Sequence, residues 1–191
     1  MSMSALDMDR LRLLAPGMLH ARPPAIGDGI ARPRGDHDHQ EHSFKVVEEH
    51  KAIPAAVLVP VVARPEGLTL LFTRRAAAMR RHAAQVAFPG GRVDEADGSA
   101  LAAALREAEE EIGLSSRFIC PLGFLDAYLT GSDYRIVPVA AEISTGFTLR
   151  LNYDEVDEVF ETPLSFLVDP ANHRREGREC NGIWRSYYAM P

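Results

Sequence analysis

Residues 91–114 are GRVDEADGSALAAALREAEEEIGL, an alanine-rich run with the spacing of one amphipathic helix. At about 100° per residue, one group of apolar side chains falls within about 60° on the helix surface: Leu101, Leu105, Ala108 and Ile112. A group of glutamates clusters on an arc about 140° away: Glu107, Glu110 and Glu111. The spacing therefore predicts a helix that packs with one face and presents acids with another.

The ends of this helix and its charges can also be predicted. Ser99 or Asp97 can accept backbone N–H bonds at the start, and Gly113 can end the helix in the left-handed conformation. Like charges at this spacing destabilise an isolated helix by about 0.2–0.5 kcal/mol per pair, so the glutamates need positive partners beyond Arg106. A solvated acidic face is the simplest interpretation. Three carboxylates shortly after Gly90-Gly91, where the main chain can approach a ligand closely, instead favour a divalent metal site.

The same stretch resembles the signature of the Nudix hydrolase superfamily, in which a glycine and a glutamate precede Arg-Glu-x-x-Glu-Glu-x-Gly. The second half of that signature is complete in Arg106, Glu107, Glu110, Glu111, Gly113 and Leu114. The first half departs from it, because Gly91 lies one residue too far from Arg106 and the internal acid is Asp97. This looser spacing is similar to that of the coenzyme A pyrophosphatase branch.

A second motif, LFTRRAAAMRRHAAQVAFPGG from residue 71 to residue 91, resembles an additional signature of that branch. The matching positions are Thr73, Arg75, Arg80, Val86 and Phe88 to Gly91. Ala76 stands where serine is common, and Ala84 stands where glycine is expected. The lost glycine affects the expected geometry of this loop. It therefore affects the assignment of the substrate more than the assignment of the reaction. The resemblance extends over residues 53–188.

The resemblance implies an α/β fold, the Nudix α/β/α sandwich around a mixed β-sheet. It also implies a metal-dependent pyrophosphatase that cleaves coenzyme A (CoA) or acyl-CoA to (acyl)phosphopantetheine and 3′,5′-ADP, with Mg²⁺ or Mn²⁺ as cofactor. One alternative is a Nudix hydrolase of another nucleoside diphosphate derivative, such as ADP-ribose, a dinucleotide or an oxidised nucleotide. Another is a non-catalytic nucleotide-binding domain, although such domains usually lose glutamates that stand here.

The resemblance also implies roles for individual residues. The metal ligands are Glu107, Glu110 and Glu111, with Arg106 holding a glutamate in orientation through a charge-assisted hydrogen bond. The general base is a helix glutamate or an acid from a distant loop, with Glu155 and Glu158 as candidates and solvated strand-edge acids as the alternative. The predicted catalytic residues are therefore Arg106, Glu107, Glu110, Glu111 and Glu155.

Substrate contacts are expected just before the acidic helix. A basic cluster there consists of Arg74, Arg75, Arg80, Arg81 and His82. Its simpler interpretation is a solvated face. Arginine forks suit phosphate oxygens, however, and we predict that Arg75 and Arg80 bind substrate. The Gly90 and Gly91 backbone is predicted to shape the loop beside the phosphates.

Strand patterns flank the helix on both sides. They occur in AAVLVPVVA, LTLLFTR and AQVAFPGG before it and in FICPLGFLDAYL, YRIVPVAAEI and VDEVFETPL after it, with PLSFLVDP as a further helix. Pro60 lies within the first strand and predicts an edge or a bulge there. Strands that alternate with only two or three helices indicate an α/β/α layered domain around a mixed sheet.

Residues 1–43 differ in composition, so we expect an N-terminal extension followed by the Nudix domain in residues 44–191. Ser4 to Leu14 predict a short amphipathic helix, and the extension is expected to pack locally or to mediate dimer contacts. His37, His39 and His42 are candidate transition-metal ligands, although solvated histidines are commoner in such segments. The resembled family continues with a further motif and a closing helix. The domain is therefore expected to lack that C-terminal segment, or the sequence is cut.

Composition limits the partners. The formal net charge of −6 argues against nucleic acid as the main partner. No apolar stretch reaches the roughly 18 residues of a membrane helix, so we expect a cytoplasmic protein with no membrane partner. A CoA-like nucleotide is the expected partner, and a homodimer remains open. Cys120 and Cys180 lack metal-ligand spacing, and Cys120 is expected to be buried and reduced.

Overall fold

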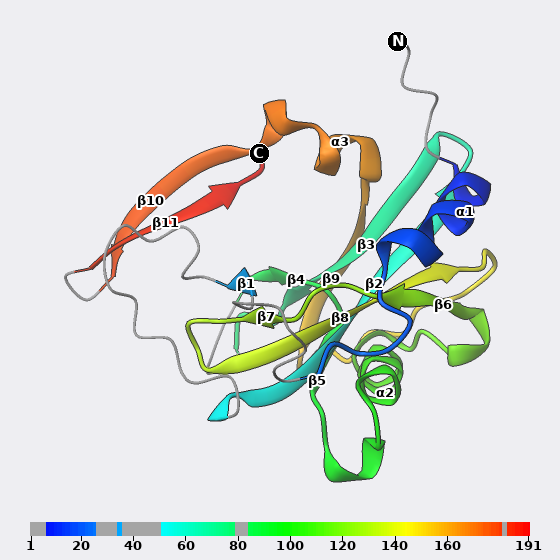
Figure 1. Cartoon of the computed structure of the whole chain (residues 1–191), viewed down its shortest axis with the longest axis horizontal. Helices are drawn as coiled ribbons and strands as arrows, with labels where there is room; N and C mark the ends of the chain where they lie inside the picture. Colours follow the sequence, from blue (N-terminus) through cyan, green and yellow to red (C-terminus); the bar gives the residue numbers. More distant parts are fainter. Residues whose placement is uncertain (1–6, 26–33, 36–50, 79–83, 181–182) are drawn as a thin grey trace.

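The computed structural model describes residues 7–25, 34–35, 51–78, 84–180 and 183–191 (Figure 1). Its elements, in chain order, are α1 (Met8–Met18), β1 (Arg34–Gly35), β2 (Ile53–Arg64), β3 (Gly67–Arg75), β4 (Val86–Ala87), β5 (Gly90–Arg92), the 3-10 turn η3 (Glu95–Asp97), α2 (Ala100–Ile112), η4 (Ser116–Phe118), β6 (Ile119–Phe124), β7 (Tyr128–Leu129), β8 (Tyr134–Ile143), β9 (Val156–Pro163), α3 (Leu164–Val168), η5 (Pro170–Asn172), β10 (Arg174–Cys180) and β11 (Ile183–Ala189).

Strand β2 lies at the centre of a mixed sheet that contains nine of the described strands. It pairs in parallel with β8, and antiparallel with β3 and β5. Beyond β8 the sheet continues through β7 to β1, and β6 also pairs with β8; beyond β3 it continues to β4 and β9. The predicted α/β fold with a mixed sheet is therefore confirmed.

The two faces of β2 are covered by different helices, because side chains alternate between the faces of a strand. Ala56, Leu58 and Val62 belong to one core together with the buried residues of α2. Val59 and Val61 belong to a second core with Met8 of α1 and the leucines of α3. The helices accordingly form layers on opposite sides of the sheet, with α2 on one side and α1 and α3 on the other (Figure 1).

Helix α2 has the predicted ends but a different buried face. Ser99 Oγ accepts a hydrogen bond from Ala102 N at 3.1 Å, and Gly113 has a φ of 68°, so both predicted caps are confirmed. The buried residues are Ala103, Ala104, Ala108, Glu111 and Ile112, whereas Leu101 and Leu105 are only partly buried. Ala108 and Ile112 are buried as predicted, but the prediction that all three glutamates lie on a separate face was wrong. Small alanines let the helix approach the sheet closely, and Glu111 lies on that buried side.

Pro60 is not at a sheet edge, so the edge alternative of that prediction was wrong. It lies opposite Ala141 of β8 inside the central strand. On the other side of β2, the pairing partner changes from β5, opposite residues 55–57, to β3, opposite residues 61–64. Pro60 falls in the interval between these two partners, where no ladder pairs are formed on that side. A proline can thus be accommodated in a central strand.

The N-terminal segment packs on the sheet wherever the structure describes it. Helix α1 spans Met8 to Met18 and so extends beyond the predicted end at Leu14, whereas Ser4 lies outside the described residues; Arg12 forms an ion pair with Glu142 of β8. Arg135 donates to the Pro24 carbonyl at 2.5 Å, and β1 pairs with β7. The boundary predicted between residues 43 and 44 stays a prediction. His37, His39 and His42 lie outside the described residues.

Three further observations complete the fold. Cys120 is exposed rather than buried, because it lies on the outward side of β6. The C-terminal strands β10 and β11 form a separate antiparallel hairpin that arches away from the main sheet (Figure 1). None of the helices in the described ranges has the length and apolar content needed to cross a membrane.

Candidate active site

The turn between β4 and β5 lies directly against α2. Gly90 N donates to Glu111 Oε2 at 3.0 Å, and the Gly91 backbone faces the Glu107 carboxylate. A methyl group on Gly91 would overlap that carboxylate, and a methyl group on Gly90 would lie 2.6 Å from Val57 Cα. Gly91 thus allows the close approach of Glu107, and Gly90 allows the close approach of β2; the predicted approach to a ligand stays a prediction.

Arg106 connects the acids of the helix to η3. Its guanidinium donates to Glu107 Oε1 at 3.0 Å and to Glu110 Oε2 at 2.8 Å, so the predicted orienting role is matched by direct contacts. It also donates to both oxygens of Asp97, at 2.8 and 3.0 Å, and to the Arg92 carbonyl at 3.1 Å. These bonds from Arg106 lower the pKa of Asp97. One arginine therefore fixes three carboxylates and the end of β5.

Glu111 is the most buried acid of the helix, with 2% of its surface exposed. Burial raises its pKa to about 7, although the Gly90 N–H and the charge of Arg75 oppose this shift. Arg75 Nη1 lies 3.6 Å from Glu111 Oε1 and supplies the positive partner that the helix charges require. The negative charges of Glu107 and Glu155 raise the pKa of Glu111 further.

Glu107 is in a similar environment. Burial raises its pKa, Arg106 opposes the shift, and the charges of Glu110 and Glu155 add to it. Glu155 thus acts electrostatically on both Glu107 and Glu111 from the residue just before β9. Glu158, the other candidate base, instead pairs with Arg74 at 3.2 Å on an exposed part of the sheet.

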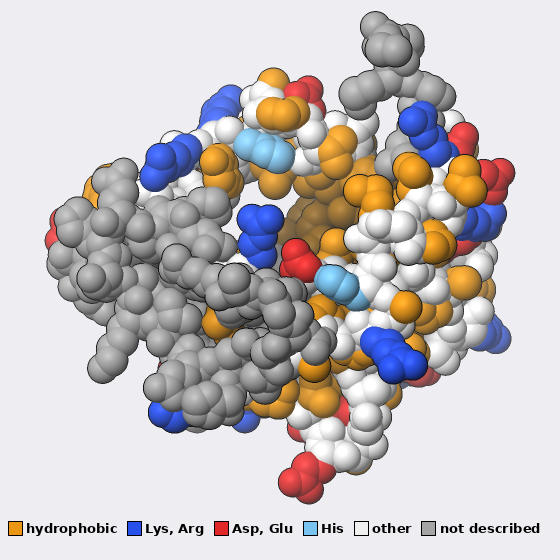
Figure 2. Space-filling model, viewed as in Figure 1, with side chains coloured by type: hydrophobic (Ala, Val, Ile, Leu, Met, Phe, Trp, Pro, Cys, Tyr) orange, Lys and Arg blue, Asp and Glu red, His pale blue; other side chains and the backbone are white. Residues whose placement is uncertain are grey.

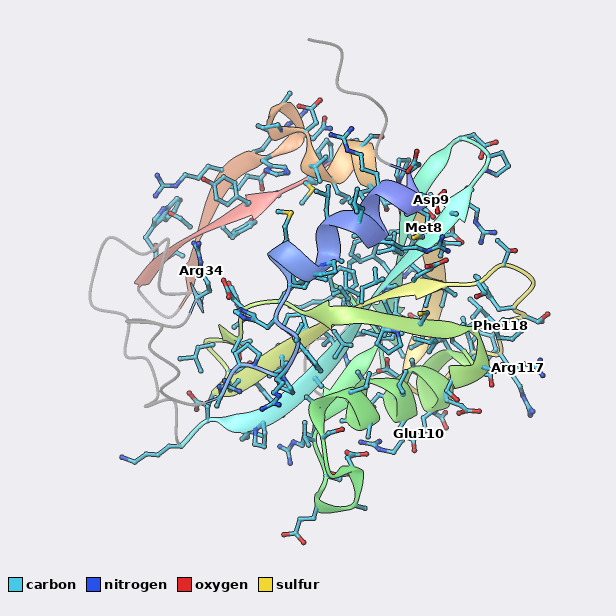
Figure 3. The ribbon with its side chains drawn as sticks, turned by 45° about the vertical axis from the view of Figure 1, so that its right-hand side comes forward. Met8, Asp9, Arg34, Glu110, Arg117 and Phe118 are labelled. Atoms are coloured by element: carbon cyan, nitrogen blue, oxygen red, sulfur yellow. The ribbon has the colours of Figure 1, made fainter. Side chains whose placement is uncertain are left out.

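The structure therefore brings most of the predicted site residues together. The group consists of Arg75, Gly90, Gly91, Arg106, Glu107, Glu110, Glu111 and Glu155. Glu110 lies at its outer margin, and Figure 3 labels it on α2, on the opposite side of the sheet from Met8. Arg80, Arg81 and His82 lie outside the described residues.

Residues 52–176 match the family model described as NUDIX domain. This chain belongs to the Nudix family. It is 42% identical over 139 residues to the "Uncharacterized Nudix hydrolase NudL" of Escherichia coli K12, covering 70% of this chain and 71% of that protein. The NudL of Cronobacter sakazakii gives the same identity and coverage. The chain is thus a Nudix hydrolase that acts on pyrophosphate bonds.

Solved structures agree with the fold. A C. elegans Ap4A hydrolase in a binary complex superposes with a TM-score of 0.50 at 20% identity, covering 61% of this chain and 83% of that one. A Nudix hydrolase from M. smegmatis, RenU, gives a TM-score of 0.50 at 20% identity, covering 59% and 71%. At this identity the likeness supports the Nudix fold alone.

Nudix hydrolases generally use divalent cations, and the donor set here fits one. Among the described residues, no three His, Cys, Asp or Glu side chains converge on one point. Arg106 and the Gly90 N–H instead hold the oxygens of Glu107, Glu110 and Glu111. Carboxylate oxygens are the hard ligands that Mg²⁺ and Mn²⁺ prefer.

Sequence reasoning missed two features of this Nudix site. Asp97 was considered as a possible helix cap, whereas it accepts hydrogen bonds from Arg106; its identity as the internal acid of the signature was the available signal. Ala84 has a φ of 57°, the left-handed conformation that the expected glycine would adopt. Its N–H donates to the Arg75 carbonyl at 3.1 Å and closes the loop that begins after Arg75.

Proposed function

We propose that this Nudix hydrolase cleaves the diphosphate linkage of CoA or acyl-CoA to 3′,5′-ADP and (acyl)phosphopantetheine, with Mg²⁺ or Mn²⁺ as cofactor. The observation that carries this proposal is the contact between the two sequence motifs. Arg75 of the upstream motif lies 3.6 Å from Glu111 of the helix motif, and Gly90 of the upstream motif donates to the same carboxylate. The signature of the CoA branch and the acids of the Nudix box thus form one site.

Each residue of the site has a chemical role in this proposal. Glu107, Glu110 and Glu111 would hold the cation, which neutralises phosphate oxygens and lowers the pKa of a bound water. Arg106 keeps Glu107 and Glu110 oriented. In this proposal Arg75 donates to a phosphate oxygen, and Arg80 of the same motif also binds substrate. Glu155 accepts the proton of the attacking water.

The backbone at Ala84 is compatible with the CoA-branch signature although the glycine is replaced. The CoA-branch signature has glycine there, and the alanine of this chain has a φ of 57°, in the region that glycine adopts freely. The bond from Ala84 N to the Arg75 carbonyl closes the loop in that conformation. The substitution therefore leaves the backbone path compatible with the signature. ADP-ribose, dinucleotides and oxidised nucleotides remain the alternatives that an assay must distinguish.

The experiment incubates purified protein with CoA and MgCl₂ or MnCl₂ and detects products by chromatography. We expect 3′,5′-ADP with either metal and none after chelation with EDTA. Parallel reactions with ADP-ribose and dinucleotides measure preference through kcat/KM. Absence of 3′,5′-ADP, with hydrolysis of another substrate in the panel, would contradict the CoA proposal while leaving the Nudix chemistry intact.

The assignment of the metal ligands is tested separately by Glu110→Gln and Glu111→Gln. We expect each variant to lose on the order of a hundredfold or more in kcat, because charged metal ligands become neutral amides. Glu109→Gln is the matched control, since Glu109 is an exposed acid on the same turn of α2. Wild-type rates in both Glu110→Gln and Glu111→Gln would show that the assignment of the site is wrong.

A further inference from the structure

The connection between β8 and β9 is hydrogen-bonded to the end of the helix that carries the acids. Arg150 N donates to the Ile112 carbonyl at 2.8 Å, and Asn152 N donates to the Glu111 carbonyl at 2.9 Å. The last carbonyls of a helix have no partner within the helix, so these bonds satisfy two of them. A methyl group on Gly113 would lie 2.9 Å from Arg150 Cβ, which shows how closely the loop approaches.

Asn152 connects this attachment to Glu155. Its carbonyl accepts from Glu155 N at 3.0 Å and from Val156 N at 2.9 Å. Its side-chain Oδ1 accepts from Asp154 N at 3.2 Å. Asparagine commonly accepts the N–H two residues ahead in this way and so stabilises a turn. Asn152 therefore links α2 to Glu155: its N–H binds the Glu111 carbonyl, and its own carbonyl and side chain accept from residues 154–156.

Little packing holds this segment from the outside. A cavity of about 530 Å³ lies beside it, lined by Glu109, Glu110, Gly113 and residues 150–154. Tyr153, in the middle of the segment, is 75% exposed. Leu149 and Leu151 pack against the main core on the inner side, whereas the outer side borders open space, where the backbone hydrogen bonds of Asn152 hold the chain.

We propose that Asn152 is a positioning residue that fixes Glu155 relative to Glu107 and Glu111. This inference rests on the proposed function, in which Glu155 is the general base. The bond from Asn152 N to the Glu111 carbonyl sets the distance between the loop and the helix. The bond from Asp154 N to the Asn152 side chain sets the direction in which the chain enters β9. Loss of the side-chain bond lets Glu155 move away from the attacking water without removing any group that touches substrate.

The test compares three substitutions at this position. Asn152→Ala removes the side-chain acceptor and leaves the backbone bonds, Asn152→Asp keeps an acceptor oxygen in the same place, and Asn152→Ser offers a weaker one. We expect kcat to fall on the order of tenfold in Asn152→Ala, since small misplacements of a reacting group cost up to about a hundredfold. Asn152→Asp should recover most of this loss, Asn152→Ser should lie between them, and KM should change little.

Two controls separate positioning from a loss of structure. Tyr153→Ala alters an exposed neighbour and should keep the wild-type kcat. The pH profile of kcat should shift in Asn152→Ala and not in Tyr153→Ala, because only the former changes the surroundings of Glu155. Equal kcat values for the alanine and aspartate variants, or a wild-type kcat in Asn152→Ala, would overturn the proposal.

Amide hydrogen exchange provides a readout that needs no substrate. Exchange in residues 153–156 should be faster in Asn152→Ala than in the wild type and close to wild-type in Asn152→Asp. Unchanged exchange in the alanine variant would overturn the positioning role even if CoA is hydrolysed. Faster exchange together with no release of 3′,5′-ADP by the wild type would instead count against the proposed substrate alone.

Discussion

At the scale of single residues, the two glycines of the β5 turn have different neighbours. Gly91 faces the Glu107 carboxylate, the far end of a flexible side chain. Gly90 has a φ of 155° and faces the backbone of β2, including Val57 Cα at 2.6 Å. A side chain at position 91 can be accommodated if Glu107 moves, whereas a side chain at position 90 must displace the central strand.

The two alanine variants should therefore separate activity from stability. Gly91→Ala should lower kcat on the order of a hundredfold with little change in melting temperature, because only the Glu107 carboxylate is displaced. Gly90→Ala should lower the free energy of unfolding by about 2–3 kcal/mol, since backbone strain and overlap both oppose the native state. Steady-state kinetics and thermal unfolding of both variants measure the two effects. A stable, fully active Gly91→Ala would contradict the role of Glu107.

Local patterns explain which site residues could be predicted. Arg106 and the helix glutamates lie in one continuous motif, and Ser99 and Gly113 mark the helix ends through their own chemistry. The partner of Glu111 could not be predicted in the same way. Arg75 is far from it in sequence and reaches it only because β3, the β5 turn and α2 meet in the fold.

At the scale of elements, an ion pair joins three strands of the sheet. Glu161 of β9 accepts from Arg64 of β2 at 2.5 and 2.9 Å and from Thr69 of β3 at 2.6 Å. These hydrogen bonds from Arg64 and Thr69, together with the Arg64 charge, lower the pKa of Glu161, with the Arg64 bond as the largest cause. The carboxylate form of Glu161 therefore stabilises the folded state.

Glu161→Gln should lower the free energy of unfolding by about 1 kcal/mol at pH 7, because Arg64 is partly exposed and its ion pair is screened. The folded pKa of Glu161 is below the ordinary value of 4.5, so its contribution is complete above pH 4.5 and is lost as the pH falls through the folded pKa. Urea unfolding at several pH values should show the wild type and variant converging in acid. Glu158→Gln, which breaks a more exposed pair with Arg74, should cost less at pH 7.

The buried face of α2 shows why element packing was harder to predict than element type. The helix itself follows from the spacing of its apolar residues. Its orientation follows from where small side chains allow contact with the sheet, and the fully buried Ala103 and Ala104 outweigh the larger Leu101 and Leu105 in that respect. Pro60 gives a similar lesson, because its tolerance depends on where β2 changes partner and not on the strand sequence alone.

At the scale of the whole molecule, the site occupies one side of the sheet and the N-terminal helix occupies the other. Met8 of α1 is 8% exposed and packs with Val59, Val61, Leu68 and Leu70. Further apolar side chains line this side between α1 and α3, where the space-filling view is hollowed (Figure 2). None of the residues of the second core belongs to the proposed active site.

Met8→Ala should therefore destabilise the protein without altering its chemistry. We expect the free energy of unfolding to fall by about 2 kcal/mol, the lower end for truncating a buried methionine at the margin of a core. The kcat for the folded enzyme at 25 °C should stay within twofold of the wild type. Thermal unfolding and steady-state kinetics measure both. If kcat per folded molecule fell by more than twofold, α1 would contribute to the active site.

The central position of β2 also affects the order in which the chain can fold during synthesis. Its antiparallel partner β3 follows immediately, so these two strands can pair as soon as both have left the ribosome. Its parallel partner β8 begins only at Tyr134, opposite Ile53. Until then one edge of β2 stays open and the apolar residues on both of its faces lack their full cover. The nascent chain is therefore most exposed to aggregation during translation of the residues between these strands.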